Sequence, residues 1–261
     1  MWRSTRMVML VALSAALYAA VLIPFKVAIP IIPGVTEVRP ANAIPIVCSL
    51  LFGPAAAWGT AFGNLIGDLF GTLTAGSVFG FVGNFVYGYL PYRAWRTMRP
   101  LGEGRDPAVG KPGWAKRTLL VALLASLSCA LIVGWGADMV KLFPFGPLSL
   151  VVSGNNFIVS ALLAPPLLAA LYPRVRRWRL LYHQVMPEGD LGRSPLGPVA
   201  HGLTWVATLG GLAVGMAISF GLEGIPLVGQ AAQLAPMAGA GSIAAGVAPA
   251  VALLLIACAL L

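Results

Sequence analysis

Apolar runs long enough to cross a membrane follow one another along most of this sequence, and short polar or basic segments separate them. A helix needs about 20 predominantly apolar residues to span the roughly 30 Å hydrocarbon core of a bilayer. The pattern predicts membrane helices over residues 7–32, 75–92, 118–143, 148–172, 199–222 and 242–261. The fold class is therefore predicted to be all-α, a polytopic transmembrane helix bundle.

Residues 38–72 interrupt this pattern with two breaks, at Pro45 and at Gly53-Pro54. If residues 41–52 descend into the membrane and residues 55–72 return, the descending helix is only about 18 Å long at 1.5 Å per residue. That length is too short for the hydrocarbon core. The segment is therefore predicted either as a tilted half-span or as part of a re-entrant hairpin covered by protein.

The basic residues indicate that residues 41–72 enter the membrane and return to the side from which they came. Of the 17 Lys and Arg, 14 lie in three clusters, at the N-terminus, at residues 93–117 and at residues 174–193. Lys and Arg favour the cytoplasmic side of a membrane, and a single crossing of residues 41–72 would place the second cluster opposite to the first. Two crossings put all three clusters on the cytoplasmic side. The prediction is a multi-pass protein of the cell membrane with eight membrane segments and both termini cytoplasmic.

Composition supports a membrane protein and narrows its partners. The chain of 261 residues is 59% hydrophobic and only 10% charged, with a mean hydropathy of +0.88, whereas soluble domains carry about 25% charge. The net charge is +9, but the basic clusters lack the interleaved aromatic residues of a base-stacking surface. We therefore expect a lipid bilayer as the surroundings and no nucleic-acid partner.

Polar residues outside the basic clusters gather toward the predicted outer side. Asp68 is the strongest candidate, because ionisable groups within a membrane are costly and often functional. Such a gathering suits a cavity for a polar, partly aromatic small molecule, on which Trp58, Phe79 or Trp135 would stack. The candidate substrate-binding residues from this pattern are Glu37, Arg39, Asn64, Asp68, Asn84, Asp138, Asn155 and Asn156.

Small residues form smooth faces on two predicted helices. Gly59, Gly63 and Gly67 recur every fourth residue and would let a neighbouring helix approach closely. In the first helix the same spacing gives a flat face formed by Ala12, Ala16 and Ala20. This second face would pack within the chain or dock on a partner membrane protein.

Known signatures of hydrolysis or metal binding are missing from the sequence. There is no P-loop, no GxSxG and no His/Glu metal motif, and the three cysteines are scattered within apolar runs without ligand spacing. We therefore expect no cofactor, no metal, no catalytic residue and no enzymatic activity. Uphill transport would draw its energy from a gradient or from another subunit.

The alanine-spaced first helix, the outer loop "TEVRPANAIP" and the stretch "LLFGPAAAWGTAFGNLIGDLFG" together resemble the substrate-binding (S) component of energy-coupling factor (ECF) vitamin transporters. Within that family they look closest to the queuosine-precursor-like and related branches. The resemblance covers roughly residues 7–178, and residues 199–261 go beyond a six-helix S component. It implies a six-segment solute-binding core at residues 1–178, then a basic cytoplasmic loop and an extra transmembrane hairpin at 179–261.

By this resemblance, the chain would be the membrane-embedded substrate-binding subunit of an ATP-driven uptake transporter for a vitamin-like small molecule. In the family, the small-residue face of the first helix meets a transmembrane coupling subunit, two cytoplasmic ATPase subunits supply energy, and the S component topples to release its cargo. The likeness implies that Ala12, Ala16 and Ala20 dock on the partner, while Glu37, Arg39 and Asn42 lie at the lid of the site.

The residues alone, without the resemblance, leave two other classes of function open. One is a self-sufficient secondary transporter or channel, in which the broken stretch 41–72 and Asp68 form an ion or proton path. The other is a membrane enzyme or assembly factor, which the lack of a catalytic set disfavours.

Overall fold

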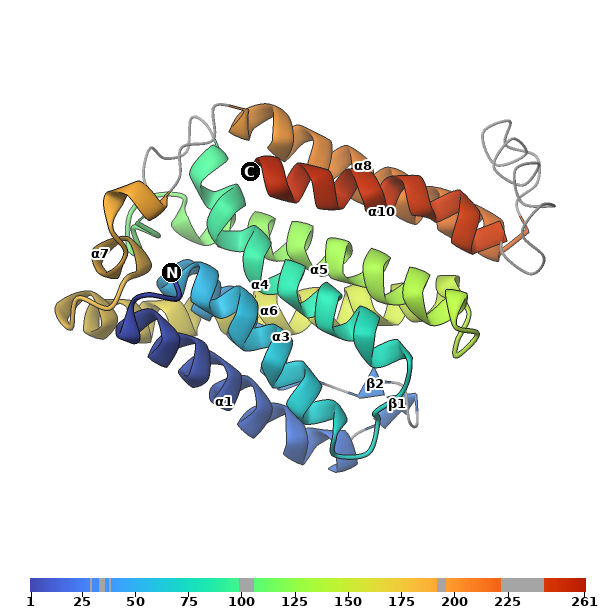
Figure 1. The fold of residues 1–261 in the computed structure, drawn as a ribbon, viewed down its shortest axis with the longest axis horizontal. Coiled ribbons are helices and arrows are strands. Elements are labelled where there is room, and N and C mark those ends of the chain that lie inside the picture. Colours follow the sequence, from blue (N-terminus) through green and yellow to red (C-terminus); the bar gives the residue numbers. More distant parts are fainter. Residues whose placement is uncertain (29, 33–35, 38, 99–105, 192–195, 222–241) are drawn as a thin grey trace.

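A helical bundle is the main feature of the computed structural model, which describes the chain except for residues 29, 33–35, 38, 99–105, 192–195 and 222–241 (Figure 1). The long helices are α1 (Thr5–Ala28), α4 (Gly76–Thr97), α5 (Trp114–Met139), α6 (Phe145–Arg177), α8 (Gly197–Ser219) and α10 (Ser242–Leu260). The shorter elements are β1 (Pro30–Ile32), β2 (Thr36–Glu37), η1 (Pro40–Asn42), α2 (Ala43–Phe52), α3 (Pro54–Asp68), α7 (Tyr182–Val185) and η2 (Glu188–Leu191). Apart from the small β1–β2 hairpin, the predicted all-α bundle is confirmed.

The helices pack side by side around a central short one. Along the chain, α3 packs on α1 and on α4, and α5 packs on α4 and on α6. Helix α2 touches α1, α3, α4 and α6, and nine of its ten residues are buried. Helices α8 and α10 form a pair that lies against α5 (Figure 1).

The predicted return of the chain within residues 41–72 is confirmed as a sharp hairpin between α2 and α3. Gly53 makes the turn with a φ of +58°, a conformation that glycine adopts without steric cost. A side chain at Gly53 would collide with the ring of Tyr182 in α7, so the turn lies beside α7. Asn42, just before α2, contacts Tyr18 in the middle of α1. Helix α2 therefore begins inside the bundle, which explains how so short a helix reaches the end of it.

Several helix bounds differ from the predicted ones. The first helix ends at Ala28 and not at residue 32, because the chain from Pro30 pairs as β1 with β2; proline has no N–H for the helix ladder. Helix α6 runs from Phe145 to Arg177, well beyond the predicted 148–172, and passes through three prolines. Prolines are tolerated in membrane helices where neighbours satisfy the freed backbone groups. After Pro91 in α4, for example, the Tyr92 N–H donates to Ser49 Oγ of α2 at 3.1 Å.

Helix length and composition agree with a multi-pass protein. Five helices within the described residues, α1, α5, α6, α8 and α10, are long and apolar enough to cross a membrane. The other three predicted segments are present as α2, α3 and α4. Helix α4 has 22 residues, and α2 and α3 together make the buried hairpin.

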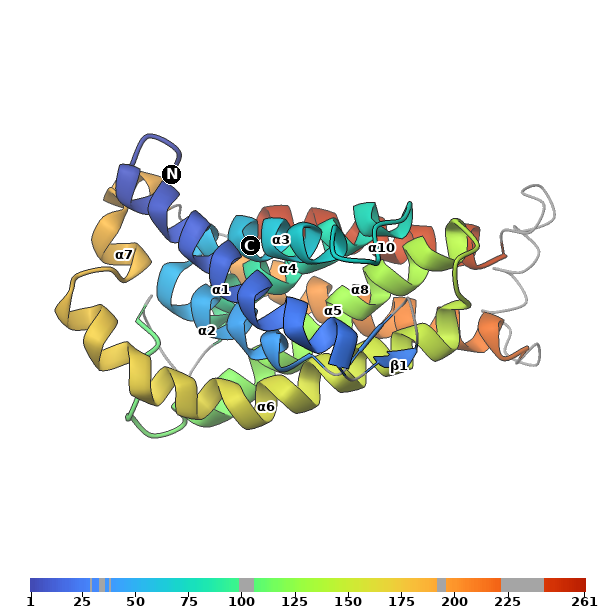
Figure 2. The ribbon, with the colours of Figure 1, turned by 90° about the horizontal axis from the view of Figure 1, so that it is seen from below.

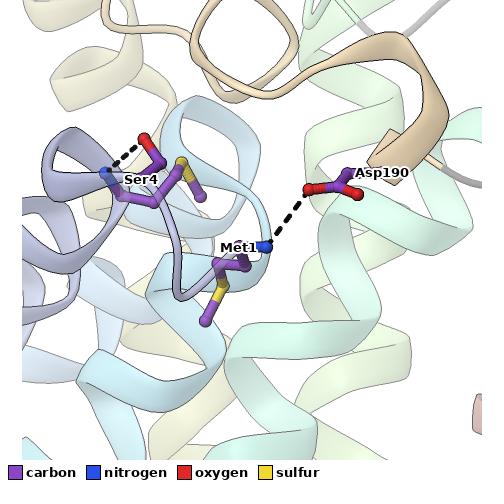
Figure 3. A network of polar contacts seen from close by, with 4 residues as sticks. Met1, Ser4 and Asp190 are labelled. Atoms are coloured by element: carbon purple, nitrogen blue, oxygen red, sulfur yellow. Dashed lines mark hydrogen bonds and ion pairs between the residues drawn. The ribbon is translucent and has the colours of Figure 1, made fainter.

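The segments that carry the three basic clusters meet at one end of the bundle, which we call the basic end. There the amino group of Met1 forms an ion pair with Asp190 at 3.3 Å (Figure 3), and Arg96 Nη1 donates to the carbonyl of Leu191 at 3.0 Å. The β1–β2 hairpin and the α3–α4 and α5–α6 turns lie at the opposite end, which we call the hairpin end (Figure 2). The relative placement of the basic segments is as predicted.

Close contact between α1 and α3 depends on the predicted glycine stripe. A Cβ at Gly59 would lie 2.8 Å from the Val11 carbonyl oxygen, and one at Gly63 would lie 2.8 Å from the Ala15 carbonyl oxygen. Because these two carbonyl oxygens belong to the backbone of α1, they cannot move without displacing that helix. The small-residue packing predicted for this stripe is therefore observed.

We expect Gly59→Ala to destabilise the protein by about 1–3 kcal/mol, the usual cost of overpacking a tight contact. The matched control is Gly202→Ala in α8, where an added Cβ meets nothing within 4 Å and where alanine favours the helix. Thermal unfolding of the purified protein in detergent measures both. An unchanged midpoint for Gly59→Ala would contradict the observed contact.

Candidate substrate-binding cavity

A cavity of about 140 Å³ opens near the hairpin end, between α3, α4, α5, α6 and the residues just before α2. This volume is several times the ~30 Å³ that a water molecule occupies in the liquid, so it has room for a small organic molecule. Its polar lining consists of Arg39, Asn42, Asn64, Asp68, Thr72, Thr74, Ser77, Asn84 and Asn156. Its apolar lining includes Cys129, Val133, Ala137, Leu142, Phe143, Leu148 and Val152.

Asp68, the last residue of α3, is held by two neighbouring side chains. Asn64 Nδ2 donates to Asp68 Oδ2 at 3.2 Å, and Thr72 Oγ1 donates to Asp68 Oδ1 at 3.1 Å. Asn64 and Asp68, four residues apart, share one face of α3, and Thr72 lies in the turn that follows the helix. Asp68 is only 7% exposed, so a ligand in the cavity would meet a carboxylate that water screens weakly.

Arg39 brings the opposite charge to the same cavity. Its Nη1 donates to Asn64 Oδ1 at 3.4 Å, and its backbone N–H donates to Asn155 Oδ1 at 3.5 Å. These contacts tie the segment before α2 to both α3 and α6. The cavity therefore carries one guanidinium and one carboxylate, a pair that suits a ligand with both hydrogen-bond donors and acceptors.

Three asparagines and a tyrosine form a buried network at the inner end of the cavity. Asn42 Nδ2 donates to Asn156 Oδ1 at 2.7 Å, which turns Asn42 Oδ1 toward the Tyr18 hydroxyl at 3.4 Å. Asn84 Nδ2 donates to the Gly80 carbonyl at 2.9 Å, which turns Asn84 Oδ1 toward the same hydroxyl at 3.1 Å. A tyrosine hydroxyl has one proton, so it can satisfy only one of these two amide oxygens at a time. The inner end of the cavity thus has spare acceptor capacity for a ligand N–H.

Two hydroxyl groups from neighbouring helices bind the backbone at the start of α2. The Tyr87 hydroxyl and Ser160 Oγ each lie 3.0 Å from the Asn42 carbonyl oxygen and 2.6 Å from each other. Because each hydroxyl has one proton, one of them donates to the carbonyl and the other donates to its neighbouring hydroxyl. Because Tyr87 belongs to α4 and Ser160 to α6, the floor of the cavity is anchored to both walls.

We expect Tyr18→Phe to lower the free energy of unfolding by about 1–3 kcal/mol, because it removes the one proton that the hydroxyl donates to a buried amide oxygen. Tyr89→Phe is the matched control, since its hydroxyl accepts from Arg93 Nε away from the cavity. Thermal or chemical unfolding in detergent distinguishes the two variants. Equal stability of Tyr18→Phe and the wild type would mean that the network does not support the cavity.

Most of the predicted site residues come together in the structure. Six of them line the cavity: Arg39, Asn42, Asn64, Asp68, Asn84 and Asn156. Asn155 lies beside it and accepts from the Arg39 backbone. Glu37 lies in β2, but its side chain is outside what the structure describes.

Asp138 lies elsewhere, at the turn between α5 and α6. Its Oδ2 accepts from the Phe145 N–H at 2.9 Å, in the first turn of α6, where helix N–H groups need an acceptor. It is not among the residues that line the cavity. Asp138 lies near the end of α5, as the predicted helix bounds implied, but its carboxylate accepts a hydrogen bond from the start of α6.

The aromatic residues expected to stack on a ligand also pack elsewhere. Trp58 packs against Trp2 and Phe85, with centroid distances of 5.5 and 4.9 Å. Phe79 packs edge-on against Trp135 at 5.8 Å. Among the lining residues that the structure describes, the aromatic one is Phe143. The sequence pattern counted it as the last residue of a predicted span, whereas it lies in the α5–α6 turn.

The alanine face of α1 points away from the bundle. Ala12, Ala16 and Ala20 are exposed, whereas Ala15 and Ala19 on the opposite side are buried at 7% and 5% exposure. Helix α1 runs along the outside of the bundle (Figure 2). A smooth surface of this kind is available to lipid or to another membrane helix.

Comparison with known protein families identifies the chain. Residues 8–173, well over half of its length, match the family model described as QueT transporter. The chain belongs to the QueT transporter family. This is a family of ECF transporter S components, so the chain is a multi-pass membrane protein and a substrate-binding subunit of a transporter.

The family match spans α1 to α5 and most of α6, and therefore contains every residue that lines the cavity. Helices α8 and α10 lie beyond it. No curated protein matched the chain. No solved structure matched it either.

Proposed function

We propose that the chain binds a queuosine precursor or a closely related vitamin-like base in the cavity at the hairpin end. It would do so as the S component of an ATP-driven uptake transporter. The single observation that carries the proposal is the cavity itself, in which Asp68, Arg39 and four asparagines line a space of about 140 Å³. Membership of the QueT transporter family supports the substrate class.

The polar groups of the cavity complement a 7-deazaguanine base, the ring system of queuosine precursors. The guanine-type edge presents an N–H and an amino group side by side, which a single carboxylate can accept together; Asp68 is placed for this role. Its ring carbonyl is an acceptor that Arg39 would meet. Further N–H groups of the base would use the acceptor capacity of Asn42 and Asn84, and Phe143 would cover the ring.

The hairpin end would face the outside of the cell and the basic end the cytoplasm. This orientation follows the positive-inside rule, since segments of all three basic clusters meet at the basic end. The cavity would then receive substrate from outside. A cytoplasmic basic end would also lie where ATPase subunits are found, and the exposed face of Ala12, Ala16 and Ala20 would contact the transmembrane coupling subunit within the bilayer.

Residues 1–178 would form the solute-binding core, and residues 179–261 an added unit. Helices α8 and α10 pack mainly on each other and on α5, and neither contributes to the lining of the cavity. We therefore expect substrate binding to depend on the first six membrane segments. The α8–α10 pair would stabilise α5 by packing against it.

Mass spectrometry of the small molecules retained after mild purification tests this proposal. We expect a 7-deazaguanine base to be released on denaturation of the wild-type protein, and added base to bind with one site per chain by calorimetry. Flux of protons or sodium through the purified chain alone, with no bound base, would instead favour a self-sufficient secondary transporter.

A further inference from the structure

Four arginines and a tryptophan gather where α6 ends at the basic end of the molecule. Arg174, Arg176, Arg177 and Arg179 are all exposed, and Trp178 among them is 65% exposed. The family match stops at residue 173, so this group lies just beyond the part of the chain that the family defines.

The group continues the exposed apolar side of α6. Leu163, Leu167 and Leu171 are spaced every fourth residue and are about 40% exposed, at 40%, 38% and 39%. Arg174 and Trp178 follow on the same helix face at the next turns. In Figure 2, α6 runs along the outside of the bundle toward α7. On a membrane helix, leucines that are followed by arginine and tryptophan mark the point where the helix passes from the acyl chains into the headgroup region.

Among the residues that the structure describes, no carboxylate forms an ion pair with these arginines. An ion pair at this end joins the Met1 amino group to Asp190. Arg176 donates to the Tyr172 hydroxyl at 3.2 Å and Arg174 to the Ala170 carbonyl at 2.9 Å, both neutral acceptors. Four positive charges within six residues repel one another unless anions approach them.

We propose that the end of α6 is a binding site for the headgroups of anionic phospholipids. The arginine guanidiniums bind the phosphate oxygens in pairs, while Trp178 lies at the level of the headgroups and the leucines above it contact the acyl chains. Lipid is favoured over a soluble anion because the charges follow directly from the lipid-facing side of the helix. The site holds the basic end of α6 at the membrane surface.

Native mass spectrometry of the full chain in detergent tests the site with defined lipids. The protein is given an equal mixture of phosphatidylglycerol and phosphatidylcholine with identical acyl chains. Wild type is expected to retain phosphatidylglycerol preferentially. Because each basic residue near a membrane surface contributes about fivefold, the triple variant Arg174→Gln, Arg177→Gln, Arg179→Gln is expected to lose at least tenfold of this preference. Arg176 is left in place because it bonds to Tyr172.

The matched control removes the same three charges at other exposed positions of the basic end, as Arg3→Gln, Arg6→Gln, Lys116→Gln. It should keep most of the preference. Equal losses in both triple variants would show diffuse charge attraction and overturn the site, as would equal retention of the two lipids by wild type. Millimolar inorganic phosphate should not displace the lipid; full displacement would assign a simple anion site instead.

A protein partner is the remaining alternative, and the same variants address it. If the α6 triple variant loses co-purifying transporter subunits while wild type shows no lipid preference, the patch is a protein interface and the lipid proposal fails. Unfolding midpoints of both triple variants should match wild type, since all six residues are exposed.

Discussion

Asp68→Asn is expected to weaken binding of a 7-deazaguanine base by about 100-fold or more. The substitution keeps the size of the side chain and an oxygen that can accept from Thr72. It removes the charge, and a hydrogen bond to a charged group contributes about 1.5–3 kcal/mol; two such bonds to one base edge account for the expected loss. Isothermal titration calorimetry on the purified protein measures the effect.

The matched control for this variant is Asp138→Asn, the same chemical change at a carboxylate that caps α6 and does not line the cavity. It should lower the unfolding midpoint slightly and leave affinity for the base within about threefold. If Asp68→Asn binds as tightly as wild type, the carboxylate is a structural group of α3. If the two variants lose affinity equally, the loss reflects stability and not recognition.

Ala16→Trp is expected to abolish association with the transmembrane coupling subunit while leaving substrate affinity unchanged. Ala16 is exposed between Ala12 and Ala20, and a flat face of this kind lets two helix backbones approach closely in lipid. An indole in the middle of this face would hold the partner helix several ångström away. Co-purification of the tagged chain with its partner subunits, together with calorimetry for the base, measures both parts.

Ala213→Trp in α8 controls for a bulky exposed side chain within the membrane, since Ala213 is exposed on the pair of helices beyond the family match. This variant should still co-purify with the partners. An intact complex with Ala16→Trp would remove the alanine face from the proposed interface, whatever the result for substrate binding.

The helical spacing of polar residues was sufficient to predict the wall of the cavity on α3. Asn64 and Asp68 share one face of α3 because four residues make slightly more than one helical turn. Thr72 lies in the turn after α3, and hydrogen bonds link all three side chains. The return of the chain at Gly53 was predictable for a different reason. Charge on the loops constrains the number of crossings, and this constraint does not depend on packing.

Other parts of the site depend on contacts between distant segments, which no local pattern shows. Tyr18 resembles any other aromatic residue of an apolar helix, yet its hydroxyl meets two amides from residues 24 and 66 positions away. Asp138 was grouped with the candidate binding residues by its place in the sequence, but the N–H of Phe145, seven residues later, donates to its carboxylate. The run from Pro30 to Ile32 continues the apolar pattern of α1, so its pairing as a strand was missed.

The most direct test of the whole account is labelling of single cysteines in intact cells with a membrane-impermeant thiol reagent. Thr74→Cys lies at the exposed rim of the cavity and Lys111→Cys at the basic end, while the three native cysteines are buried. We expect Thr74→Cys to be labelled from outside and protected by a 7-deazaguanine base, and Lys111→Cys to stay unlabelled. Labelling of Lys111→Cys from outside, or no protection of Thr74→Cys by the base, would contradict the account.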